Sequence, residues 1–160
     1  MLFRSGARLV DTVRNRPAGR SAVAAFRSVV VDDAGMFDRI AAGDAEMLAQ
    51  ARATARVIVD SPTLLARERQ TLHAVAASLA AVLSETETGD GTGDEPDPVA
   101  HAVANALMGV HLALLDYSRR RLLDDDRPET IAADLRHYGE RALSRLERGL
   151  DTTPATEGPR

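Results

Sequence analysis

The four histidines are the residues whose type most readily supports chemistry, and their spacing argues against a metal site. They are spread along the chain, and none lies four residues from another or beside paired acidic residues in the pattern that holds zinc on a helix. The chain has no cysteine, which excludes disulfides and thiolate ligands. We therefore expect neither a metal nor a cofactor. His111 lies on an otherwise apolar helix face, which fits a buried or interface histidine; contact with a ligand is the alternative. The four are His73, His101, His111 and His137.

Patterns that support nucleophilic catalysis or phosphate binding do not occur in the sequence. There is no GxSxG, Walker A or GxGxxG pattern. Residues 89–93 read GDGTG, but no strand precedes them and no Gly-Lys-Ser/Thr ending follows. We expect that the protein is not an enzyme, because no acid–base or nucleophile set is visible. A small helical enzyme is a weaker interpretation than the two given below.

The overall composition predicts a helical protein of one domain. A chain of 160 residues can bury a sizeable core. With 44% hydrophobic but only 3% aromatic residues, that core must consist mainly of Ala, Leu and Val, which favours helices. The net charge of −4 lacks the basic excess of a chain that binds DNA by itself. We find no long apolar stretch without a charge and no leader sequence, and so expect a cytoplasmic protein without membrane contact.

Cap residues and apolar periodicity predict an all-α antiparallel bundle of about six helices. Ser61-Pro62 and Asp97-Pro98 each combine an N-cap with proline at the first helical position. Gly35 is expected to interrupt a helix. Residues 85–97 are expected to form a flexible acidic loop within a domain spanning 1–150, followed by a disordered tail, 151–160. The predicted helical segments are 1–16, 21–32, 36–42, 44–59, 62–84, 98–123 and 129–148.

The segment 98–123 is apolar on two sides at 100° per residue. A helix that is apolar on two sides must be buried on two sides, so its own core covers one and a further partner must cover the other. We therefore expect a homodimer. One side carries Val99, Val103, Leu107, Val110, Leu114 and Tyr117. The other carries Ala100, Ala104, Met108, His111, Leu115 and Leu122.

The order of these segments resembles the C-terminal domain of TetR-family transcriptional regulators. Residues 55–67, ARVIVDSPTLLAR, resemble the family's helix that ends in a Ser/Thr-Pro-x-Leu step. Residues 76–83 are similar to its LAxxLA helix, 99–121 to its long Ala-rich helix, and 131–150 to its last amphipathic helix. The resemblance covers about residues 9–150 and is greatest to the mycofactocin-regulator type.

The resemblance implies a regulatory domain with two tasks. In the family, the last two long helices pair with those of a second subunit, and the middle helices enclose a pocket for a small apolar or acyl-type effector. The effector shifts the spacing of two DNA-reading heads. The family's N-terminal helix-turn-helix has no counterpart here. We therefore expect a truncated gene product that would contact DNA only through the missing helix-turn-helix.

Helix faces provide candidate residues for both tasks, although most apolar residues of this kind are simply core. A free-standing helical protein–protein interaction module, with the two-sided helix docking on an unlike partner, is the alternative function. The ligand-pocket candidates are Met36, Phe37, Ile40, Met47, Ala51, Ile58, Leu72, Val103 and Leu107. The dimer-interface candidates are Ala104, Met108, His111, Leu115, Leu135, Tyr138 and Ala142.

Overall fold

The structure is a computed structural model that describes residues 2–88 and 97–150, and every regular element in these ranges is an α-helix. This confirms the predicted all-α bundle of about six helices. The helices are α1 (Leu2–Arg14), α2 (Ala22–Ala41), α3 (Ala45–Val59), α4 (Pro62–Thr88), α5 (Pro98–Leu123) and α6 (Pro128–Leu150).

Polar caps begin four of these helices, and two of the caps, Ser61 and Asp97, are those predicted from the sequence. Each cap side chain accepts a hydrogen bond from a backbone N–H two or three residues further on, over 3.0–3.3 Å. These bonds satisfy donors that the first helical turn leaves without a partner. Pro62 and Pro98 occupy the first helical positions of α4 and α5, as expected. The four cap residues are Ser21, Asp44, Ser61 and Asp97.

The predicted helix break at Gly35 is wrong. The helix α2 continues through this residue to Ala41 and ends before Gly43, whose φ of 110° suits glycine alone. A glycine inside a helix costs about 1 kcal/mol relative to alanine. Phe37 and Ile40, which follow Gly35, are both buried, and their burial offsets that cost.

The helix α4 is also longer than predicted. It runs to Thr88, so residues 85–88 of the expected acidic loop are helical. The rest of that expected loop up to residue 96, and the tail expected at 151–160, lie outside the described residues.

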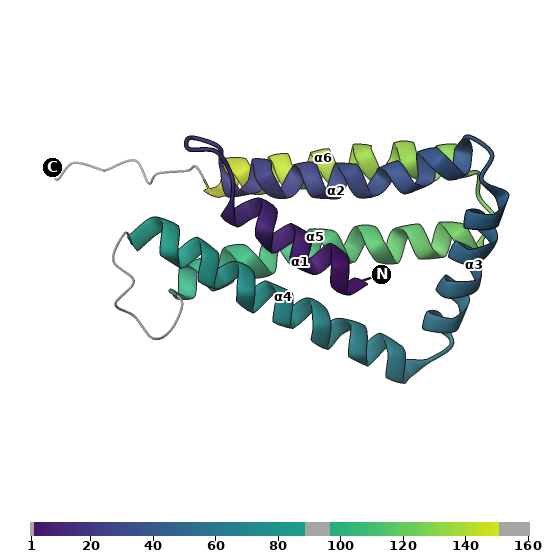
Figure 1. Ribbon diagram of the computed structural model, residues 1–160, viewed down its shortest axis with the longest axis horizontal. Helices are drawn as coiled ribbons and strands as arrows, with labels where there is room; N and C mark the ends of the chain where they lie inside the picture. The colour runs from purple at the N-terminus through teal and green to yellow at the C-terminus, as the bar shows by residue number, and fades with distance from the viewer. Residues whose placement is uncertain (1, 89–96, 151–160) are drawn as a thin grey trace, which may run out of the picture.

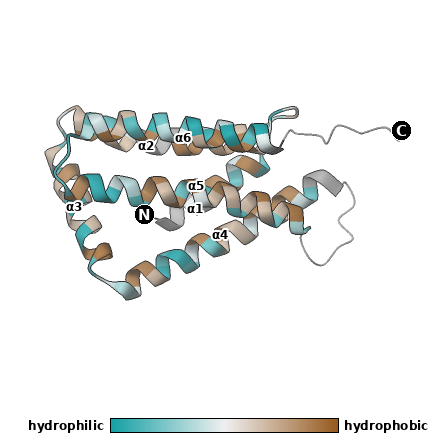
Figure 2. Cartoon of the chain, turned by 180° about the vertical axis from the view of Figure 1, so that it is seen from behind, coloured by the Kyte–Doolittle hydropathy of each residue, from teal (hydrophilic) through white to brown (hydrophobic). Residues whose placement is uncertain are grey.

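The helices form a bundle in which α2 and α6 lie side by side and α1 packs between α2 and α4 (Figure 1). The antiparallel helices α4 and α5 are in contact near the end of α4 and diverge toward α3, which spans the gap between their other ends (Figure 1). Figure 2 shows the same divergence from behind. The three helices α3, α4 and α5 therefore form a triangle.

Two apolar cores hold this arrangement together. The main core joins α1, α2, α4, α5 and α6, and its largest fully buried side chains include Phe26, Leu79 and Leu107. The second core lies at the α3 end and joins α2, α5 and α6, with side chains of α3 packed against it. Its buried members are Phe37, Ile40, Leu122, Ile131, Ala132 and Leu135.

The expectation that the chain has no long apolar stretch without a charge is wrong for α5. Within the described residues it is the one helix long and apolar enough to cross a membrane, with a mean hydropathy of 1.5 over its most apolar 18-residue window. A long apolar stretch therefore does exist, and residues 98–115 carry no Asp, Glu, Lys or Arg. In the bundle α5 packs against α4 and α6, yet only 28% of that window is buried.

Candidate functional site

The predicted ligand-pocket residues do not come together around one cavity. Five of them, on α2 and α3, belong to the second core or pack against it: Met36, Phe37, Ile40, Met47 and Ala51. Leu72, Val103 and Leu107 belong to the main core or pack against it, and Ile58 is half-buried outside both. In this state the candidates act as packing residues of two separate clusters.

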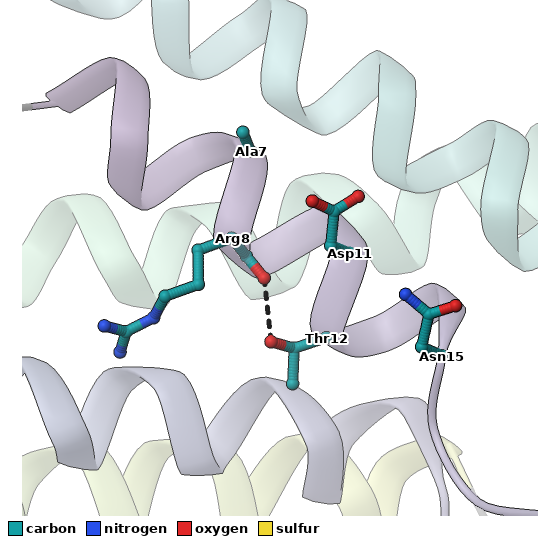
Figure 3. Close-up of a pocket in the computed structure, with 5 residues that line it drawn as sticks. All are labelled: Ala7, Arg8, Asp11, Thr12 and Asn15. Atoms are coloured by element: carbon teal, nitrogen blue, oxygen red, sulfur yellow. Dashed lines mark hydrogen bonds between the residues drawn. The ribbon is translucent and has the colours of Figure 1, made fainter.

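The best-defined surface depressions are shallow and lie away from these candidates. One follows the outer side of α1 and is lined by Ala7, Arg8, Asp11, Thr12 and Asn15. Figure 3 shows these side chains pointing in different directions, and the Thr12 hydroxyl donates a hydrogen bond to its own helix at the Arg8 carbonyl over 2.7 Å. Ligand sites are usually concave and mostly apolar, with converging polar groups. This depression therefore does not have the form of a binding site. A second depression, lined by side chains of α6, is also open to solvent.

An ion pair lies inside the triangle of α3, α4 and α5. Glu68 of α4 and Arg119 of α5 are only 5% and 6% exposed, and the pairing is bidentate. Arg119 Nη1 donates to Glu68 Oε2 over 2.6 Å, while Nη2 donates to Oε1. The half-exposed Asp116 lies 3.7 Å from Nη1. We call Glu68 and Arg119 the α4–α5 ion pair.

The interface candidates need correction at three positions. Ala104, Met108 and Leu135 are buried inside the subunit. Side chains that already fill a subunit core cannot also form the interface between two folded subunits. Both predicted apolar sides of α5 are therefore largely covered within the subunit, because Leu107 on the first side is also buried and Val103, Val110 and Leu114 pack against the main core. Of the other candidates, Tyr138 is exposed, and His111, Leu115 and Ala142 are half-buried.

The open side of α5 carries a row of small apolar residues. We call Val99, Ala102, Ala106, Gly109 and Ala113 the outward α5 face. All are exposed except the half-buried Ala106, and Val99 is 59% exposed. Their spacing of three and four residues in alternation is that of a row along which a second helix packs. Their small size lets the backbone of such a helix approach closely.

An aromatic cluster joins α5 to α6 beside this face. The Tyr117 hydroxyl donates a hydrogen bond to Asp134 Oδ2 over 2.5 Å, and the Tyr117 and Tyr138 rings meet edge to face with centroids 5.4 Å apart. The Arg121 guanidinium lies 5.7 Å from the Tyr117 ring centroid. Burial, together with the hydrogen bond to Asp134 and its negative charge, raises the pKa of Tyr117 from 10.0 to about 12.

We expect Tyr117 to ionise near pH 12 in the folded protein. Because the folded state favours the neutral phenol, the stability this group contributes is present below pH 10 and is lost as the pH rises from 10 to about 12. A titration followed by phenolate absorbance should show a late phase that Tyr117→Phe removes. A phenolate signal that is nearly complete by about pH 11, one unit above the ordinary pKa, in the folded protein would contradict this expectation.

The buried Glu68 and Arg119 were not predicted, although their positions in the sequence carry a signal for burial. Glu68 lies three residues after Leu65 and four before Leu72, on the apolar stripe of its helix. Arg119 lies three residues before Leu122, also on a buried side, but it belongs to a run of three arginines near a helix C-terminus, where the helix dipole favours cations. A charge at a core position of each of two neighbouring helices indicates a pair.

No chemical centre emerges from the side chains that the structure describes. Within residues 2–88 and 97–150, no group of three or more His, Asp or Glu side chains is placed to hold a metal ion. In comparisons with known proteins, no family model, no curated protein and no solved structure matches the chain.

Proposed function

We propose that this chain is the effector-binding and dimerisation portion of a TetR-type transcriptional regulator that works in the cytoplasm. The observation that carries the proposal is the incomplete cover of α5. A helix with a mean hydropathy of 1.5 has only 28% of its apolar window buried in the subunit. Exposed apolar faces of this kind mark interaction sites.

A second copy of the chain fits the outward α5 face. The alternating spacing of its small residues suits another helix, and α5 itself offers such a helix in a symmetric dimer. Tyr138 on the neighbouring α6 is exposed and can add an aromatic contact at the edge. In the proposed dimer α5 and α6 form the interface between the two subunits, and none of the described helices contacts DNA.

The interior of the triangle formed by α3, α4 and α5 is the proposed place for an effector. Ala55, Leu72 and Leu122 are buried on these three helices, and the half-buried Ile58 and Leu65 lie at the α3–α4 end. Leu72 and Leu122 pack into the two cores in this state, and apolar side chains of this kind suit a small apolar or acyl-type molecule once they separate. The described state is closed, so effector entry requires a local rearrangement.

A free-standing helical interaction module is the second candidate function. Val57, Val59 and Leu64 are exposed at the corner where α3 meets α4. In Figure 1 this corner lies far from α6, so a dimer through the outward α5 face and α6 would not cover it. Because the dimer would leave this second apolar surface uncovered, the surface favours binding of a different protein.

Light scattering coupled to size-exclusion chromatography tests the proposal. We expect a mass twice the chain mass of 17.1 kDa at micromolar concentration. A mass of one chain over the whole concentration range would overturn the proposed dimer and favour the interaction module. In parallel, an apolar or acyl ligand at 100 times its Kd should stabilise the fold by about 2.7 kcal/mol, which a thermal-shift screen detects.

A further inference from the structure

The α4–α5 ion pair is unusual because both of its side chains are buried. Among the side chains whose burial the structure describes, Glu68 and Arg119 are the only charged ones that are buried. In the pair of Arg27 with Glu147, by contrast, each side chain keeps more than a fifth of its surface exposed. Buried leucines lie one turn from each member of the α4–α5 ion pair, Leu72 from Glu68 and Leu122 from Arg119.

The pair spans α4 and α5 where these helices are separated. Glu68 lies near the start of α4 and Arg119 near the end of α5, which is the side of the triangle closed by α3. Toward this side the two helices diverge (Figures 1 and 2). Two long charged side chains therefore connect the helices on the side toward which they diverge.

A buried ion pair is a weak source of stability, because desolvation of the two charges cancels much of their attraction. A bidentate ion pair does, however, require one particular geometry. Only one placement of α4 against α5 keeps both hydrogen bonds of the fork. Separation would leave the buried Glu68 carboxylate without Arg119, and would leave Arg119 with only the half-exposed Asp116 on its own helix. An apolar pair at these positions would tolerate sliding and would hold no single distance.

We infer that the α4–α5 ion pair holds the interior between α3, α4 and α5 closed, and that this interior opens as a local unit when the pair is broken. The inference rests on the proposed function in one respect: it names the contact that an entering effector must loosen. Opening would separate the start of α4 from α5 and leave α2 packed on α6, because the α2–α6 contacts lie outside the triangle.

Hydrogen exchange on the full chain tests the inference with Glu68→Gln, which removes one charge at nearly constant shape. We expect amides in α3 and in α4 up to Val75 to exchange about tenfold faster or more, while amides of α2 and α6 keep their rates. The neutral fluorescent probe N-phenyl-1-naphthylamine should also bind the variant more strongly than the parent. The inference requires both changes, and the absence of either overturns it.

Two further variants keep the result interpretable. Asp38→Asn breaks the exposed pair between Asp38 and Arg136, which joins α2 to α6, and should change neither readout. Arg119→Lys keeps the charge but loses the fork, and it replaces Glu68→Gln if that variant does not fold. Acceleration by the same factor in all helices would mean that the pair serves global stability, and would overturn the inference. Light scattering on the same samples tests the proposed dimer separately.

Discussion

Gly109→Glu is expected to convert a dimer of this chain into monomers while each subunit keeps its fold. A Cβ atom built at Gly109 meets no atom within 4 Å in the subunit, so the larger side chain fits without a clash. Replacing a helical glycine also raises helix propensity, by up to about 1 kcal/mol. In the proposed dimer, two like charges would meet in an apolar interface, which should raise the dimer Kd about 100-fold or more. Sedimentation velocity and thermal melts measure the two effects.

Gly35→Glu is the matched control for this prediction. Gly35 also lies inside a helix and also has no atom within 4 Å of a built Cβ, but it belongs to α2. Both variants change the net charge by the same amount, so a general charge effect would weaken both dimers equally. Equal weakening, or a Gly109→Glu dimer as tight as the parent, would place the interface away from the outward α5 face.

Local signals in the sequence predicted the element boundaries well, because each boundary depends on one or two residues. Ser61 and Pro62 fix the start of α4 by a side-chain cap and a pre-set φ, and both effects act without tertiary structure. Gly35 failed as a signal because burial of residues on both sides of it outweighs a cost of about 1 kcal/mol. Tertiary packing therefore keeps α2 continuous through Gly35, and apolar periodicity alone does not predict such packing.

The candidate site was less predictable, because it depends on which side of α5 each neighbouring helix covers. Periodicity showed that α5 is apolar on two sides, but it could not show that the subunit's own core buries Ala104 and Met108. The row around Gly109 was overlooked because small residues contribute little to an apolar stripe. Their role in close helix approach depends on backbone geometry, which a hydropathy pattern does not record.

Leu107→Ala is expected to cause the largest loss of stability of the substitutions considered. Leu107 is 0% exposed and lies in the main core, where α5 meets the other helices. Truncating a fully buried leucine costs the lost burial and leaves a cavity, together about 2–5 kcal/mol. For a domain of this size, that corresponds to a drop in Tm of about 5–15 °C. Thermal melts at one fixed protein concentration measure it, since dimerisation makes Tm depend on concentration.

The same substitution decides between the two roles that remain for Leu107. A leucine that lines a ligand pocket has few packing partners on its open side, so its truncation costs little until a ligand is bound. Leu64→Ala removes the same atoms from an exposed position at the α3–α4 corner and should change stability by about 0.5 kcal/mol or less. If Leu107→Ala is as mild as Leu64→Ala but abolishes ligand-induced stabilisation, Leu107 belongs to the pocket. A loss several-fold larger than that of Leu64→Ala makes it a core residue, and the effector must then enter nearer α3.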